Sequence, residues 1–164
     1  MKARVMIYTL LIFIFVTAQV TVLNMFKFFG LTPNIIIILV VSIALLEGKI
    51  QGAVVGFISG LCLDAVVGRS LGFYALFGMF LGLALGNINK RFFKENILVM
   101  GICTFVSSIV YESVIVFTNN LFFTRFNFTE TLVQYIIPEA CINSLAGILI
   151  FIIIIRLMKR IPAT

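Results

Sequence analysis

Apolar residues form six long runs along the chain, and short polar or charged segments separate them. The runs cover residues 5–23, 32–46, 50–67, 71–88, 97–118 and 135–155. A hydrocarbon core about 30 Å thick is crossed by roughly 20 helical residues. The pattern therefore predicts an all-α integral membrane protein with six transmembrane helices, which form a single transmembrane domain over residues 1–164.

The second run is short for a complete crossing. We expect it either to begin earlier, within 28–31, or to lie where protein rather than lipid surrounds it. Thr32 and Pro33 are typical of a helix start, so Thr32 is predicted as the N-cap, with Pro33 at the first helical position.

Composition supports a membrane environment. The chain is 62% hydrophobic and 11% charged, whereas soluble domains are nearer half apolar and a quarter charged. The net charge of +6 does not indicate nucleic-acid binding, because the basic residues stand in clusters between apolar runs.

Catalytic and metal chemistry lack their usual residues in this sequence. There is no histidine, and the three cysteines lie inside apolar runs without metal-ligand spacing. We interpret Cys62, Cys103 and Cys141 as small packing residues. No nucleophile–base pair or phosphate-binding loop is found either, so we expect a protein that is not an enzyme and needs no cofactor or metal.

The distribution of basic residues predicts the orientation. Glu47-Gly48-Lys49 is either a tight turn between two spans or part of one crossing. Six spans with both termini in the cytoplasm place nine basic residues inside (Lys2, Arg4, Lys49, Lys90, Arg91, Lys94, Arg156, Lys159, Arg160) and three outside (Lys27, Arg69, Arg125). Treating 33–67 as one crossing gives four inside and seven outside, against the positive-inside rule. Six spans are therefore favoured.

Glycines recur every fourth residue in the third and fourth runs, and this spacing keeps them on one helix face. The stripes are Gly52, Gly56, Gly60, Asp64 and Gly68, then Gly78, Gly82 and Gly86. Such faces let another backbone come close. Two interpretations are open: the stripes pack helices within this chain, or they form a groove for a partner's helix.

Several polar residues lie within the spans, where they usually face protein. Glu112 shares a face with Thr104 and Ser108, and Glu139 shares one with Asn143 and Gly147; Asp64 ends the first stripe, with Arg69 near enough to pair. Three interpretations of Glu112, Glu139 and Asp64 are open. The side chains hydrogen-bond between helices, they bind a polar ligand or ion along a transport path, or they contact a partner's transmembrane segment.

The order of these features resembles the bacterial rod shape-determining membrane protein family MreD. Thr32-Pro33-Asn34 opens an aliphatic span, and the glycine-spaced span ends in Leu63-Asp64. Gly68, Leu71-Gly72 and the basic turn Asn89-Lys90-Arg91 follow. The resemblance covers nearly the whole chain, although the family often has aspartate where this chain has Asn34.

The resemblance implies a non-catalytic scaffold or regulatory subunit of the cell-elongation machinery in the bacterial plasma membrane. Its implied partner is the membrane protein MreC. Through MreC it is linked to the MreB filament, the RodA glycosyltransferase and a class B penicillin-binding transpeptidase, and so to sidewall peptidoglycan synthesis.

The implied fold is similar to the substrate-binding subunit of energy-coupling-factor transporters. This likeness gives an alternative function, a small-molecule-binding subunit of a vitamin-type transporter. Such a subunit needs a polar pocket open to the outside. The outer segment 119–134 is rich in phenylalanine but poor in polar recognition groups, which favours the scaffold.

Overall fold

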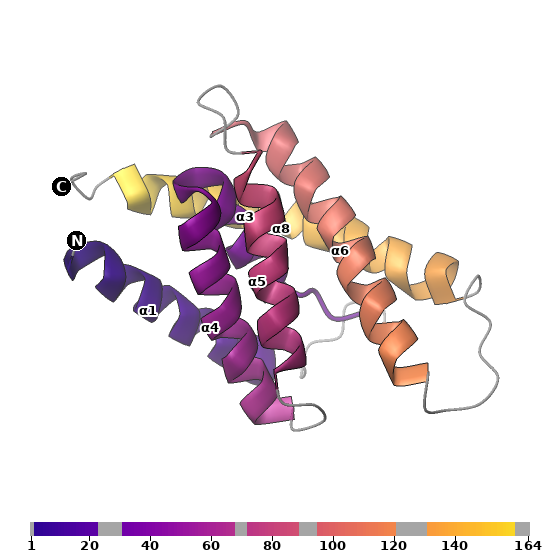
Figure 1. Ribbon diagram of the computed structural model, residues 1–164. Helices are drawn as coiled ribbons and strands as arrows, with labels where there is room; N and C mark the ends of the chain where they lie inside the picture. The colour runs from indigo at the N-terminus through magenta and orange to yellow at the C-terminus, as the bar shows by residue number, and fades with distance from the viewer. Residues whose placement is uncertain (1, 23–30, 68–71, 89–94, 121–130, 160–164) are drawn as a thin grey trace.

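The computed structural model describes residues 2–22, 31–67, 72–88, 95–120 and 131–159. These residues form six α-helices: α1 (Lys2–Thr17), α3 (Ile35–Glu47), α4 (Lys49–Val67), α5 (Phe73–Gly86), α6 (Ile97–Asn120) and α8 (Ile137–Lys159). Two π-helical segments, η1 (Ala18–Val22) and η2 (Leu132–Ile136), extend α1 and precede α8. The predicted all-α architecture is confirmed (Figure 1).

The helices fall into two classes of length. Four apolar segments are long enough to cross a bilayer: Arg4–Thr21, Lys49–Val66, Ile97–Val116 and Leu132–Lys159. The other two helices, α3 and α5, are shorter. At 1.5 Å per residue, the 13 residues of α3 extend only ~20 Å, about two thirds of the hydrocarbon core.

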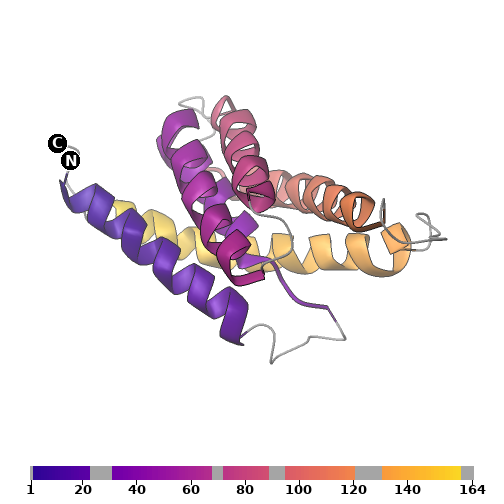
Figure 2. The same cartoon turned by 60° about the horizontal axis from the view of Figure 1, so that its bottom comes forward.

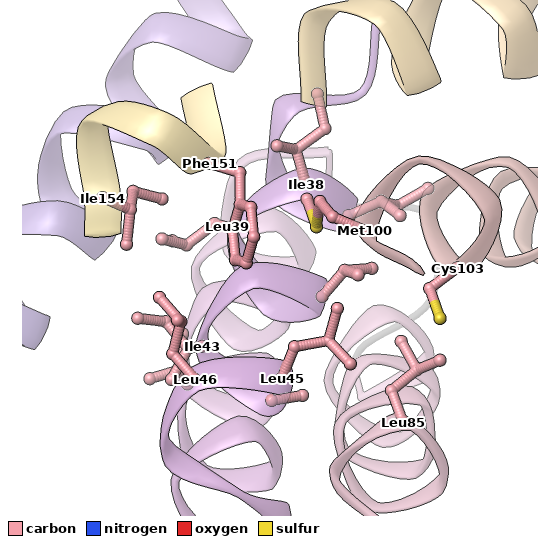
Figure 3. Close-up of a cluster of buried hydrophobic side chains, with 14 of the residues drawn as sticks. Ile38, Leu39, Ile43, Leu45, Leu46, Leu85, Met100, Cys103, Phe151 and Ile154 are labelled. Carbon is pink, nitrogen blue, oxygen red and sulfur yellow. The ribbon is translucent and has the colours of Figure 1, made fainter. Parts of the chain in front are cut away.

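The short helix α3 is the core of the bundle. Every residue from Ile36 to Leu46 is buried, which suits a helix that is apolar on all sides. It packs against α4, α5, α6 and α8. Figure 3 shows its Leu39 and Ile43 side chains among Phe151 of α8 and Met100 of α6. Protein rather than lipid surrounds this span, which is the second of the two expectations above.

The cysteines differ in their surroundings. Cys103 is buried in this core, and Cys62 is half-buried. Cys141 is exposed, so its interpretation as a packing residue is wrong. It lies on the outward face of α8, next to the buried Ala140.

A single residue joins α3 to α4. Gly48 has φ +99°, a region that favours glycine, and its N–H donates to the Ala44 carbonyl at 3.0 Å. The next helix turns back at once and passes close to α3. Glycine at position 52 allows this approach, because a Cβ there would overlap Ala44. Residues 33–67 therefore form two helices with a tight turn between them.

The glycine stripes of α4 and α5 face each other. A Cβ on Gly56 would overlap the carbonyl of Gly78, and a Cβ on Gly82 would overlap the backbone of Gly52. Gly60 lies against the backbone at Tyr74 in the same manner. Gly86 completes the series against the backbone at Gly48 and Lys49. The two helices thus pack backbone to backbone within the chain, and α5 occupies the face that a partner's helix would need. Gly68 lies outside the described residues.

The bundle has two chemically different ends. The start of α1 and the end of α8 lie at the same end (Figures 1 and 2). This end carries two ion pairs, Arg4 with Glu47 at 2.8 Å and Lys159 with Glu95 at 2.6 Å. We call it the cationic end. The opposite end holds the last turn of α1 and the first turns of α3, α5 and α8.

We predict that Gly56→Ala destabilises the bundle by about 1–3 kcal/mol, because the added methyl group meets backbone that cannot move aside. The matched control is Gly101→Ala, whose methyl group would meet only side-chain atoms of Ile148 and Ser144, 3.3–3.4 Å away. Thermal unfolding in detergent measures both variants. Equal melting temperatures for the two variants would contradict the backbone-to-backbone packing of α4 and α5.

Candidate binding pocket at the end of the short helices

A pocket of about 240 Å³ opens at the end opposite the cationic end. Four helical elements, η1, α4, α5 and α6, contribute to it, together with the residue that precedes α3. Its lining combines polar side chains with aliphatic walls: Gln19, Val20, Asn34, Leu63, Tyr74, Tyr111, Glu112 and Ile115. The described side chains thus gather hydrogen-bonding groups from segments far apart in the sequence.

The pocket forms where α3 begins. The first backbone N–H groups of a helix have no partner within the helix, and at membrane depth water cannot replace one. Here the Asn34 N–H donates to Asn143 Oδ1 at 2.7 Å, and the Ile35 N–H donates to Gln19 Oε1 at 2.8 Å. Asn34 Oδ1 accepts from the Ile37 N–H at 3.4 Å. Side chains from α8 and η1 therefore complete the start of α3.

The N-cap of α3 is Asn34, so the prediction of Thr32 as the cap is wrong. Asn34 follows Pro33 and supplies the side-chain oxygen that accepts from the helix. Gln19 adds a second bond on the same side, since its Nε2 donates to the Pro33 carbonyl at 3.3 Å. The helix can begin after the proline because these partners fix residues 33–35.

Asn143 continues the polar contacts into the α6–α8 interface. Its Nδ2 donates to Ser108 Oγ at 3.1 Å, and both side chains are fully buried. Nearby, Ser144 Oγ donates to the Gly101 carbonyl at 3.0 Å. Thr104 is buried against Gly147, and its hydroxyl contacts Met100 Sδ at 3.7 Å. Thr104, Ser108 and Asn143 are thus brought together between α6 and α8.

Two carboxyl groups lie next to this network. Glu112 lines the pocket beside the Asn34 side chain. Glu139, in the first turn of α8, lies close enough to Glu112 for the two groups to interact electrostatically. Neither forms an ion pair with a described residue. No group of three or more metal-ligating side chains is found in the described ranges.

Two tyrosines form the aromatic wall of the pocket. The rings of Tyr74 and Tyr111 are 6.2 Å apart between centroids, and Phe77 packs edge-on against Tyr111 at 5.2 Å. Tyr111 is almost fully buried, and its hydroxyl lies near the Asn34 side chain. This contact joins α5 to α6 beside the Glu112 carboxyl group, so aromatic and polar side chains line the same pocket.

Asp64 hydrogen-bonds between two helices, which is the first of the three interpretations given above. Its two carboxyl oxygens accept from the backbone N–H groups of Tyr74 at 3.1 Å and Ala75 at 3.0 Å. The N-cap of α5, Gly72, has φ +92° and offers no side chain, so an acid on α4 caps α5. A carboxylate is also favoured at this end of a helix dipole. Arg69, the expected partner, lies outside the described residues.

Sequence reasoning missed Gln19, Asn34, Tyr74 and Tyr111 as lining residues of the pocket. Gln19 was detectable as an amide inside an apolar span, where polar groups usually have a protein partner. The two tyrosines gave no separate signal, because aromatic residues are frequent in the chain. The phenylalanine-rich part of segment 119–134 falls largely outside the described residues.

Residues 1–161 match the family model described as rod shape-determining protein MreD. The chain belongs to the MreD family. No curated protein and no solved structure matched it. An MreD protein takes part in bacterial rod-shape determination and cell elongation, and the apolar helices of this member make it a multi-pass membrane protein.

We predict that Asp64→Ala destabilises this MreD protein by about 1–3 kcal/mol, because two backbone N–H groups at the start of α5, one of them buried, lose their acceptors. Asp64→Asn keeps one acceptor oxygen and should lose less than the alanine variant. Thermal unfolding in detergent compares the two. A melting temperature unchanged by Asp64→Ala would show that α5 does not depend on this cap.

We also predict that Asn143→Ala costs more stability than Ser108→Ala. The first change removes the acceptor of the Asn34 N–H as well as the donor to Ser108, whereas the second removes only a hydroxyl partner. The expected loss for Asn143→Ala is about 1–3 kcal/mol. The same unfolding assay tests the order, and the reverse order would contradict the described bonds.

Proposed function

We propose that this MreD protein is a non-catalytic scaffold and regulatory subunit of the cell-elongation machinery in the bacterial plasma membrane. In this role it binds an MreC-type membrane protein. That contact links it to the MreB filament, the RodA glycosyltransferase and the class B penicillin-binding transpeptidase, and so to sidewall peptidoglycan synthesis. The observation that carries the proposal is the family match over residues 1–161.

The proposed orientation places both termini in the cytoplasm. Support comes from the cationic end, where the described residues Arg4, Lys49, Arg156 and Lys159 belong to helix ends on one side of the bundle. Basic residues favour the cytoplasmic side. Most of the other basic residues lie outside the described ranges. In this orientation the pocket opens to the outside.

We assign partner recognition to the pocket rather than to the glycine stripes. The glycine stripes of α4 and α5 already pack against each other and leave no space for a partner's helix between them. The pocket instead presents Glu112, two tyrosines and an amide to whatever enters it. A polar segment of the partner that lies just outside the membrane fits this position and chemistry.

The alternative function is a small-molecule-binding subunit of a vitamin-type transporter, with the fold of an energy-coupling-factor substrate-binding subunit. The polar, partly aromatic pocket favours it, since an outward-facing pocket of this kind is what such a subunit needs. The family match favours the scaffold. The two functions predict different phenotypes for the same depletion experiment.

The test is rescue of a rod-shaped bacterium depleted of its own MreD. We expect the unaltered chain to restore rods and to co-purify the MreC-type partner. Ile115→Trp fills the pocket and should abolish both results, while Val110→Trp, on the exposed face of the same helix (46% exposed), should preserve them. Membrane levels of both variants must match.

Two outcomes would contradict the proposal. If depleted cells stay rod-shaped but lose uptake of a vitamin, the transporter function is correct. If Ile115→Trp restores rods and retains the partner as well as Val110→Trp does, the scaffold role does not use the pocket.

A further inference from the structure

A second hollow lies on the membrane-facing side of the bundle, between α1 and α4. It has a volume of about 220 Å³, and its surface is almost entirely apolar although Tyr8, Thr9 and Gln51 also line it. Ile12 and Val55 form its floor and are nearly buried, whereas Val5, Ile50 and Val54 form an exposed rim. Both helices are candidate membrane spans, so hydrocarbon chains rather than water surround the rim. We call this hollow the α1–α4 groove.

The shape of the groove selects a slender occupant. A helix with its side chains is about 10 Å across, and membrane helices dock closely where both surfaces carry small residues. The small face of α4 is already covered by α5, and the groove presents valine and isoleucine instead. A flexible acyl chain fits between such branched side chains without needing a small-residue surface.

Charge at one end of the groove selects the head group. Arg4 immediately precedes Val5 on α1, and Lys49 immediately precedes Ile50 on α4, so both cations stand at the same end. Glu47 pairs with Arg4 at 2.8 Å. Lys49 is exposed and takes no part in the ion pairs of the described residues. One positive charge therefore remains in excess where the groove reaches the membrane surface.

We propose that the α1–α4 groove is a binding site for one anionic phospholipid. An acyl chain lies along Ile12 and Val55, and the phosphate is held by Lys49 with Arg4 beside it. The site is separate from the pocket at the opposite end of the bundle. It does not depend on the partner or the transport function assigned to that pocket.

The experiment is native mass spectrometry of the purified full chain with phosphatidylglycerol and phosphatidylcholine of identical acyl chains. We expect phosphatidylglycerol to be retained preferentially. Lys49→Gln should lower its retention about fivefold, as expected for losing one basic contact near a lipid head group, and should leave phosphatidylcholine unchanged. Lys159→Gln is the control, because it removes another exposed cation from the same end.

A second pair of variants tests the groove itself. Val54→Trp fills it and should lower retention of both lipids, while Leu149→Trp on the exposed face of α8 (66% exposed) should not. Photo-crosslinking of the unaltered chain with a diazirine-bearing acyl chain should label α1 and α4. This measurement needs no variant, so it decides the matter if Val54→Trp fails to fold.

Three results would overturn the proposal. Equal retention of the two lipids by the unaltered chain would remove the anionic preference. Crosslinks confined to α6 or α8 would place the bound lipid elsewhere. If Val54→Trp keeps its lipid but loses the MreC-type partner, the groove belongs to a protein contact.

Discussion

The structure depends on satisfying the backbone N–H groups at the starts of two short helices. Helices α3 and α5 begin inside the bundle, where a bilayer offers no water to accept their first hydrogen bonds. The longer helices supply the acceptors: Gln19 and Asn143 at α3, and Asp64 at α5. Because these partners come from different segments, completing the short helices also fixes how the long ones are arranged around them.

The pocket is a consequence of the same constraint. A helix that starts part-way through the bundle leaves space beyond its first turn, and the side chains that cap it line that space. Asn34 illustrates this double role, since its side-chain oxygen caps α3 and its side chain also lines the pocket beside Glu112. Hydrogen bonds thus connect the helices at the end that holds the pocket, whereas ion pairs connect them at the cationic end.

Close packing of α4 on α5 makes this arrangement possible. With glycine at each contact, the two backbones touch, and α5 can lie near enough for Asp64 to reach its first turn. The branched residues Ile50, Val54 and Ile58 lie on a different face of α4, outside this contact. Only one face of α4 is needed for α5, and the other is left to lipid and to the α1–α4 groove.

Much of the fold could be predicted from the sequence because its signals are periodic. Runs of apolar residues located the helices, and the four-residue glycine spacing indicated two faces for close approach. The stripes alone could not say what covers them, and the structure places α5 on α4. The shortness of the second apolar run predicted either an earlier helix start or burial within protein, and the sequence did not distinguish between them.

The pocket was less predictable because it depends on pairs of residues far apart in the sequence. Gln19 hydrogen-bonds to Ile35, and Asn143 hydrogen-bonds to Asn34, 109 positions away in the sequence. No local sequence pattern indicates either contact. The N-cap of α3 was predicted wrongly for the same reason. Thr32 and Pro33 satisfy the local rule for a helix start, yet tertiary bonds to Asn34 and Ile35 move the start to Ile35. Glu47 likewise found its partner in Arg4, on another helix.

The central claim is that the capped ends of the short helices form the outward face, with the pocket open to the cell exterior. Cysteine labelling in intact cells tests it most directly, in a chain whose three native cysteines are replaced by alanine. The account predicts that a cysteine at position 115 reacts with a membrane-impermeant maleimide, while one at position 156 reacts only after the membrane is opened. Labelling of position 156 in intact cells, with position 115 protected until lysis, would contradict it.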